Sequence, residues 1–425
     1  MQRSNYRIDT LLVTILLILC PIADNINGML LLSGNDSDIS SFVKIIVFLL
    51  IILTKMHNVK ICRKTFYKYM FFIVTISVAL VHSVYLFYNG LSYEINMFIK
   101  LIYPILLFNY LYSLNDISSV KLIYRAIDFY LWFYPLSLLI PSILGYGYNT
   151  YGNFGIGSKG FYYAGNEISG IMVVLMLVSL TQYDNARNKI NLFNLLLNIV
   201  AAFFVGTKSV FIGIVAVVIL YLFKRAKSIY FIVYLLGIIL LIIIMCYILR
   251  CIRPDFMNEI INMWNIRYTY NVKGQYSNEK VAFMLSGRNA ILKNNYLELW
   301  NKFGIMGFIF GGGTFFWNVM SNNIIEMDIF DLLIDYGILA TFAYIMVICD
   351  IFKKVNYKSE VYRIGLMLII VLLSFLAGHV VFAPSVTIVM VIALIYFEKN
   401  DIYSNDKEKI NIKLKETSYE KSTIN

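Results

Sequence analysis

The feature that most constrains this chain is a series of long apolar segments separated by short polar connections. About twelve segments approach the roughly 20 mostly apolar residues that an α-helix needs to cross a bilayer. They span residues 9–32, 40–56, 66–88, 93–114, 121–142, 166–183, 190–206, 208–224, 228–250, 328–349, 361–381 and 384–397. The second and the last are the weakest, so a count of ten or eleven stays open. The pattern predicts an all-α, polytopic transmembrane bundle of about twelve helices.

The composition is that of a membrane protein with little soluble mass. Hydrophobic residues make up 60% of the 425 residues and charged residues 14%. In soluble domains, about 45–50% of the residues are apolar and about 25% are charged. The net charge of +11 raises the alternative of nucleic-acid binding. However, the positive residues lie mostly in short loops and the tail, where they orient a membrane protein. We therefore expect one integral membrane domain over residues 1–425, with no nucleic-acid partner.

Along the chain, predicted loops that are rich in lysine and arginine alternate with loops that carry almost none. Five loops are rich in these residues, near 55–68, 121–125, 187–189, 224–227 and 353–363. Under the positive-inside rule, these loops are cytoplasmic, as are both termini and the tail at 398–425. Two longer segments are then extracytoplasmic: a smaller loop at 143–165, rich in Gly and Tyr, and a large cap at 251–327 between the ninth and tenth helices. We expect substrate chemistry in this cap.

No sequence motif indicates a metal, a nucleotide or another cofactor. The five cysteines are scattered without metal-like spacing, which also disfavours a disulfide framework. No Walker loop, Rossmann fingerprint, zinc motif or nucleophile elbow is visible. We therefore expect neither a metal ion nor a cofactor.

Three basic residues on the expected outer side are candidates for binding an anion. Lys208 lies at the turn between the seventh and eighth helices, where the charge rule does not explain it; the alternative is a lysine that extends to lipid headgroups. Arg288 follows a glycine in MLSGRNAI, and its planar fork suits phosphate oxygens; the alternative is a solvated loop arginine. Lys159, in the smaller loop, is a weaker candidate.

Four acids lie at the outer end of an apolar segment, in EMDIFDLLIDYG: Glu326, Asp328, Asp331 and Asp335. Ionised carboxylates are unfavourable in lipid, so some must line a wet cavity or pair with cations. Helix capping is the alternative for one of them. Residues two apart on a regular helix do not share a face. We therefore expect one of Glu326 and Asp328, preferably Glu326, to face the cavity and the other to cap or pair.

Three further residues are candidates to line a substrate site. Asn166 and Glu167 open the sixth predicted helix after a glycine, where capping is the alternative for Asn166. His379 lies near the outer end of the eleventh helix, where packing is its alternative role.

Five stretches, in this order, carry a family resemblance: GSKGFYYAGNEISG, VGTKSVFIG, LSGRNAI, EMDIFDLLIDYG and LAGHVVFAP. Together they resemble the Wzy-type polysaccharide repeat-unit polymerases, within the O-antigen ligase and polymerase superfamily. The resemblance covers the chain from about Gly155 to Pro384. Relatives often have arginine where Lys208 stands, and ligase-like members often have His-Asn in place of Glu326-Met327. The second departure argues against ligase activity.

The resemblance implies a bacterial cytoplasmic-membrane glycosyltransferase that is independent of metal ions. It would join undecaprenyl-pyrophosphate-linked repeats into capsule, O-antigen or exopolysaccharide on the outer face. Arg288, Lys208 and Lys159 would contact pyrophosphate, and Glu326 or Asp328 would act as base. Its partners would be the bilayer, lipid-linked oligosaccharides, a flippase and a chain-length regulator.

Two other functions stay open. A lipid-linked oligosaccharide flippase would need a central cavity open alternately to both sides, often between related halves, and the large one-sided cap argues against it. A polysaccharide ligase of the same superfamily would transfer the glycan to a different acceptor.

Overall fold

The computed structural model describes residues 2–35, 38–55, 63–151, 156–225, 285–321, 324–355, 361–376, 378 and 380–399, with isolated residues between 233 and 265. The predicted segment 228–250 lies mostly outside this part of the chain. So do most of the cap before residue 285 and the tail from residue 400 onward.

The described part is mostly helical. The helices are α1 (Gln2–Leu32), α2 (Ile39–Lys55), α3 (Arg63–Leu86), α4 (Leu91–Tyr112), α5 (Ile117–Ile143), α6 (Gly165–Ala186), α7 (Lys189–Val205), α8 (Lys208–Arg225), α12 (Arg288–Phe310), α13 (Asp328–Val355) and α14 (Val361–Leu376). Residues 384–399 form another helix, and η1 (Tyr88–Gly90) and η3 (Phe316–Met320) are short turns. Each predicted apolar segment other than 228–250 coincides with one of these helices.

Several of the helices are long and apolar enough to cross a membrane. Within the described residues, five helices meet both criteria: Arg63–Leu86, Tyr88–Tyr112, Ile117–Ile143, Gly165–Ala186 and Asp328–Val355. Others, such as Lys189–Val205, are apolar but short; 17 residues reach only about 25 Å at 1.5 Å per residue, against a hydrocarbon core of about 30 Å. Large apolar side chains are exposed on several helices, including Val81, which is 70% exposed. These features indicate a membrane protein, and the count of twelve spans stays a prediction.

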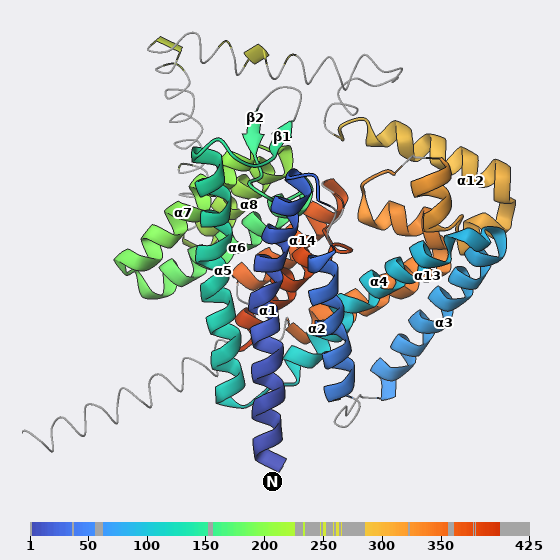
Figure 1. Cartoon of the computed structure of the whole chain (residues 1–425), viewed down its shortest axis with the longest axis horizontal. Coiled ribbons are helices and arrows are strands. Elements are labelled where there is room, and N and C mark those ends of the chain that lie inside the picture. The colour runs from blue at the N-terminus through green and yellow to red at the C-terminus, as the bar shows by residue number, and fades with distance from the viewer. Residues whose placement is uncertain are drawn as a thin grey trace, which may run out of the picture.

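Helix α6 is the central helix of one half of the molecule (Figure 1). It contacts α5, α7, α8 and α14, and every residue from Ile168 to Thr181 is buried. A helix that is apolar all round belongs in an interior. Helix α8 lies very close to α6 at Gly213, because a Cβ at this position would lie 2.3 Å from a methyl carbon of Val173 in α6. This close packing holds the middle of α6 against α8.

Helices α3, α4, α12 and α13 form the other half (Figure 1). Helix α13 breaks at Gly337, where φ is 74° and ψ is 178°. Beside the break, the carbonyls of Ile334 and Asp335 accept hydrogen bonds from the backbone of Gly312 and Gly313, each at 2.9 Å. The glycine run after α12 can approach so closely because it carries no side chains.

A buried acid anchors the segment that follows α12. Glu94 of α4 is 1% exposed. Its Oε1 accepts hydrogen bonds from Ser83 Oγ at 2.8 Å and from the backbone N–H of Phe315 at 3.0 Å, while Tyr336 donates to Oε2 at 2.9 Å. Asp335, one of the four acids noted in the sequence, lies close by and accepts from Thr314 at 3.2 Å. The network ties the segment between α12 and α13 to α3 and α4.

The smaller loop folds back over the helix ends. Strands β1 (Asn149–Tyr151) and β2 (Ile156–Ser158) pair antiparallel, with Asn149 opposite Ser158, so the loop adds a small hairpin to the predicted all-α fold. Thr150 donates to the carbonyl of Val205 at 2.7 Å and fixes the hairpin on the end of α7. Helix α1 runs from the N-terminal end of the chain toward the end of the molecule where the hairpin lies (Figure 1).

Charged residues meet at the other end of the helices. Lys224 at the end of α8 pairs with Asp184 near the end of α6 at 3.1 Å. Lys68 near the start of α3 pairs with Asp350 near the end of α13 at 2.5 Å. Because α6 begins beside the hairpin, the pair at Asp184 is separated from the hairpin by the length of that helix. The lysines of these predicted cytoplasmic loops therefore lie away from the hairpin.

Candidate functional site

An ion pair between Arg288 and Glu326 lies at the centre of the candidate site. Arg288 begins α12, and its Nη2 lies 2.7 Å from Oε2 of Glu326. Its Nη1 donates to the carbonyl of Leu376, the last residue of α14. The arginine side chain is 11% exposed and the glutamate side chain 45% exposed. The guanidinium is thus fixed between helix ends, while solvent or a ligand can reach the carboxylate.

The backbone of Glu326 has an unusual conformation. Its φ of 60° lies in the left-handed region, which costs a non-glycine residue roughly 1–2 kcal/mol. Asp331 holds the turn by accepting from the backbone N–H groups of Ile325 at 3.2 Å and Met327 at 2.8 Å. Gly378 packs against the same turn, because a Cβ there would lie 2.0 Å from the carbonyl oxygen of Glu326. Strain that the surroundings enforce in this way is often found at functional sites.

Asp328 has a different environment from Glu326. It begins α13, is 1% exposed, and its Oδ2 accepts from the backbone N–H groups of Val380 at 3.1 Å and Val381 at 2.8 Å. The carboxylate therefore joins the start of α13 to the segment after α14. The expectation that Glu326 and Asp328 share a regular helix is wrong, because α13 begins at Asp328 and Glu326 lies before it in a left-handed turn.

Asn166 and Lys208 complete the group around Arg288. The Nδ2 of Asn166 donates to Oε2 of Glu326 at 3.4 Å, and Lys208 donates to Ser286 Oγ at 3.2 Å. The N-cap of α6 is Ala164, which makes no side-chain cap hydrogen bond within the described residues, and Asn166 lies inside the helix, so N-capping does not explain Asn166. We call Asn166, Lys208, Ser286, Arg288 and Glu326 the Arg288 cluster. It joins the starts of α6, α8 and α12 to the turn before α13.

Lys159 lies in the smaller loop and is bonded within it. Its ammonium stands 5.5 Å from the ring centre of Tyr148 and 5.6 Å from that of Tyr163, and it donates to the Tyr163 carbonyl. Partial burial lowers the pKa of Lys159 below its ordinary value. A Cβ at Gly165 would lie 3.9 Å from both the Cδ of Lys159 and the Cγ2 of Thr207. Lys159 is therefore near the α7–α8 turn, but its described contacts are not with the Arg288 cluster.

Two candidates from the sequence remain, Glu167 and His379, and the structure describes only Glu167. Glu167 follows Asn166 in the first turn of α6 and lines a cavity next to the Arg288 cluster. His379 lies outside the described residues.

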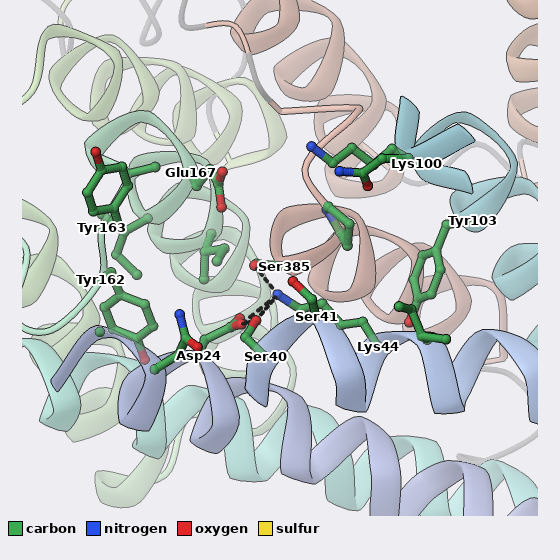
Figure 2. A pocket seen from close by; sticks show the side chains of 18 of the residues that line it. Asp24, Ser40, Ser41, Lys44, Lys100, Tyr103, Tyr162, Tyr163, Glu167 and Ser385 are labelled. Carbon is green, nitrogen blue, oxygen red and sulfur yellow. Dashed lines mark hydrogen bonds and ion pairs between the residues drawn. The ribbon is translucent and has the colours of Figure 1, made fainter. Parts of the chain in front are cut away.

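The cavity beside the cluster is a chamber of about 400 Å³ between α1, α2, α4, α6 and the helix at 384–399. Four charged side chains line it: Asp24, Lys44, Lys100 and Glu167 (Figure 2). Lys44 lies 2.5 Å from Asp24 Oδ1 and 2.8 Å from the hydroxyl oxygens of both Ser40 and Ser385. Tyr162 and Tyr163 of the smaller loop also line the chamber, so it lies at the hairpin end of the helices.

Sequence reasoning missed three of these charged residues, although a signal was present. Asp24, Lys44 and Lys100 each interrupt a predicted apolar segment. Ionisable residues within membrane segments are rare and usually functional. The same rule that selected Lys208 therefore also selects Asp24, Lys44 and Lys100.

The arrangement combines two kinds of chemistry. The Arg288 cluster has two cations and one carboxylate, which suit an anion and a proton acceptor side by side. Asn166 belongs to this cluster and the adjacent Glu167 lines the chamber, so the two sites are neighbours. Within the described part of the chain, no three His, Cys, Asp or Glu side chains are grouped so as to hold a metal ion.

Comparison with known proteins found no matching family model and no matching curated protein. The fold and the site therefore define only a class of protein. It is a mostly helical membrane protein with a charged site and a polar chamber at one end of its helices.

Proposed function

We propose that this protein is a polysaccharide polymerase of the Wzy type. It transfers a glycan from one lipid-pyrophosphate carrier to a second lipid-linked repeat, on the outer face of the bacterial cytoplasmic membrane. The observation that carries this proposal is the Arg288 cluster, where Arg288, Glu326 and Lys208 converge from separate elements of the chain.

The two cations suit a pyrophosphate. Arg288 lies close enough to Lys208 to repel it electrostatically, and like charges held together favour binding of an anion. Glu326 offsets one of the two positive charges, so the three side chains carry a net charge of about +1 when all are ionised. As the lipid pyrophosphate departs, negative charge grows on its oxygens, and both cations stabilise it.

Glu326 suits the role of general base. Its carboxylate is partly exposed and is held by Arg288 and Asn166 through Oε2. A hydroxyl of the incoming repeat gives its proton to the carboxylate and attacks the anomeric carbon of the growing chain. The new glycosidic C–O bond forms as the bond from that carbon to the pyrophosphate oxygen breaks. The electron pair leaves with the lipid pyrophosphate, and the proton stays on Glu326 until water removes it.

In the proposed topology, the protein crosses the membrane twelve times, both termini are cytoplasmic and the site is extracytoplasmic. It is supported by the separation of the lysine-bearing helix ends, such as Lys224 with Asp184, from the hairpin end where the cluster lies. The lipid carriers of both substrates require a site beside the bilayer, and the start of a membrane helix provides one. A flippase that supplies repeats and a chain-length regulator are the expected partners.

A lipid-linked oligosaccharide flippase is the second candidate, and the chamber favours it. Charged side chains between helices are what a transport path requires. The discriminating experiment is deletion of the protein, followed by location of the lipid-linked repeats that accumulate. Single repeats on the outer face support a polymerase, whereas repeats confined to the cytoplasmic face support a flippase. Polymer that is complete but not attached to its acceptor supports a ligase.

A further inference from the structure

Lys100 and Glu167 are the two charged residues of the chamber that lie apart from the bonded set around Lys44. Both line the cavity, and Figure 2 shows their side chains on opposite sides of the same space. Neither makes a hydrogen bond or an ion pair with any residue in the described part of the chain. By contrast, Lys44 below them is fully engaged by Asp24, Ser40 and Ser385.

An ionised group away from bulk water is costly unless water or a ligand bonds to it. Lys100 offers only donors and Glu167, when ionised, only acceptors. A ligand that spans the gap between them must accept from one side and donate to the other. A hydroxyl group does both, and the neighbouring hydroxyls of a sugar ring present such pairs on one face.

The charges of the chamber also argue for a neutral ligand. Asp24 with Lys44 and Glu167 with Lys100 give two acids and two cations, so the chamber has no excess positive charge when all four are ionised. The Arg288 cluster, with two cations and one acid, does have such an excess. A pyrophosphate therefore belongs at the cluster and an uncharged ring in the chamber.

The size and walls of the chamber fit a sugar. Its volume of about 400 Å³ falls within the roughly 300–1,000 Å³ typical of small-molecule sites. The bonded set of Asp24, Ser40, Lys44 and Ser385 gives one fixed wall. Tyr163 also lines the chamber and is 72% exposed, so it adds aromatic surface on which the apolar face of a sugar ring can pack.

We propose that the chamber binds a neutral sugar ring of a glycan, with Lys100 donating to its hydroxyl oxygens and Glu167 accepting from its hydroxyl groups. The assignment of that sugar to the acceptor repeat rests on the proposed function. Glu167 follows Asn166, whose side chain contacts Glu326, so a sugar in the chamber lies next to the proposed base.

The test is direct binding to the purified full-length protein in lipid nanodiscs. The probe is a lipid-free repeat-unit oligosaccharide, released from the polysaccharide of the same strain, and binding is measured by saturation-transfer NMR titration. Lys100→Met and Glu167→Ala are each expected to weaken binding at least tenfold. The matched control is Lys302→Met, because Lys302 is exposed on α12 and pairs with Glu298 outside the chamber. Wild-type affinity in both chamber variants overturns the inference, as does absence of binding to the wild-type protein.

A second measurement does not depend on removing a charge. Ser41 lines the chamber, so Ser41→Cys places a thiol there, and the parent protein gives the background from its own cysteines. The oligosaccharide is expected to slow modification of Cys at this position by a water-soluble thiol reagent at least threefold. Unchanged modification in the presence of saturating oligosaccharide contradicts the inference.

Failure of this inference is distinguishable from failure of the proposed function. Arg288→Ala should abolish polymer and leave oligosaccharide binding unchanged, since Arg288 is outside the chamber. If the chamber variants bind normally while Arg288→Ala stops polymerisation, the sugar assignment is wrong and the polymerase proposal stands. If the chamber binds the oligosaccharide but Arg288→Ala and Glu326→Gln both make normal polymer, the sugar assignment stands and the catalytic role of the Arg288 cluster, which carries the polymerase proposal, is wrong.

Discussion

The Nη2 of Arg288 lies 2.7 Å from Oε2 of Glu326 and joins the first residue of α12 to the turn before α13. Asn166 donates to the same oxygen at 3.4 Å. The shared oxygen is thereby engaged from α6 and α12, while the Glu326 side chain stays 45% exposed. A carboxylate held in this way is oriented before any substrate arrives, which is the condition for efficient proton transfer.

Arg288→Ala is expected to abolish long polymer or shorten it sharply. Loss of a cation that stabilises the departing pyrophosphate is expected to cost about 2.7–4 kcal/mol, by analogy with removal of one oxyanion donor. The measurement is polymer length on gels, alongside the amount of protein in the membrane. Lys302→Ala, which removes an exposed cation from the same helix, serves as control. Long polymer from Arg288→Ala at normal abundance contradicts the proposed role.

Glu326→Gln is expected to reduce polymer formation by about 10²–10⁴-fold, the usual contribution of a general base. Glutamine keeps the size and the hydrogen bond to Arg288 but cannot accept the proton. Turnover of purified protein with lipid-linked repeats measures the effect, and binding of the repeats should persist. Full turnover by this variant excludes Glu326 as the base.

Asp328→Asn is the matched comparison for Glu326→Gln and is expected to act on stability. Asp328 is buried and accepts two backbone hydrogen bonds; bonds to a charged group are each worth about 1.5–3 kcal/mol. A lower melting temperature and less protein in the membrane are expected, with near-normal turnover per folded molecule. A well-folded but inactive variant would transfer the role of base to Asp328.

The sequence predicted the helices well because the bilayer leaves few alternatives for an apolar segment of this length. It also selected Arg288, Glu326, Asn166 and Lys208, which the fold brings together. The left-handed turn at Glu326 was not predictable, because it depends on Asp331 and on the close approach of Gly378. Residues 326 and 378 are far apart in the chain, and only the packed fold brings them into contact.

The chamber was also not predictable from the sequence, because it forms only when separate helices pack together. Asp24, Lys44 and Lys100 lie on three different helices, and each is visible in the sequence as a charge in an apolar segment. Which of them share a cavity depends on helix rotation and neighbours, which hydrophobic pattern alone does not specify. The hairpin in the smaller loop was also unexpected, because three-residue strands carry too little pattern to be recognised.

Gly313→Ala is expected to destabilise the segment between α12 and α13. Gly313 has a φ of 86°, and a Cβ there would lie 1.9 Å from Ser83 Oγ. The conformation alone costs alanine roughly 1–2 kcal/mol, and displacing Ser83 disturbs its bond to the buried Glu94. A lower melting temperature of the purified protein is the readout. The control is Gly34→Ala, where φ is also positive but no atom lies within 4 Å of the added Cβ. Equal effects of the two substitutions would show that the contact with Ser83 is unimportant.

The sidedness of the site can be tested with single cysteines at exposed positions. Tyr146 is 68% exposed in the smaller loop, and Ala186 is exposed at the last residue of α6. Because α6 separates the two positions by its full length, they should lie on opposite faces of the membrane. Tyr146→Cys is expected to react with an impermeant thiol reagent in intact cells, and Ala186→Cys only after the membrane is opened. Cells carrying the unsubstituted chain give the background labelling. Reaction of Ala186→Cys but not Tyr146→Cys in intact cells would place the Arg288 cluster on the cytoplasmic side. The proposed polymerisation requires the outer face, so the polymerase proposal would then fail.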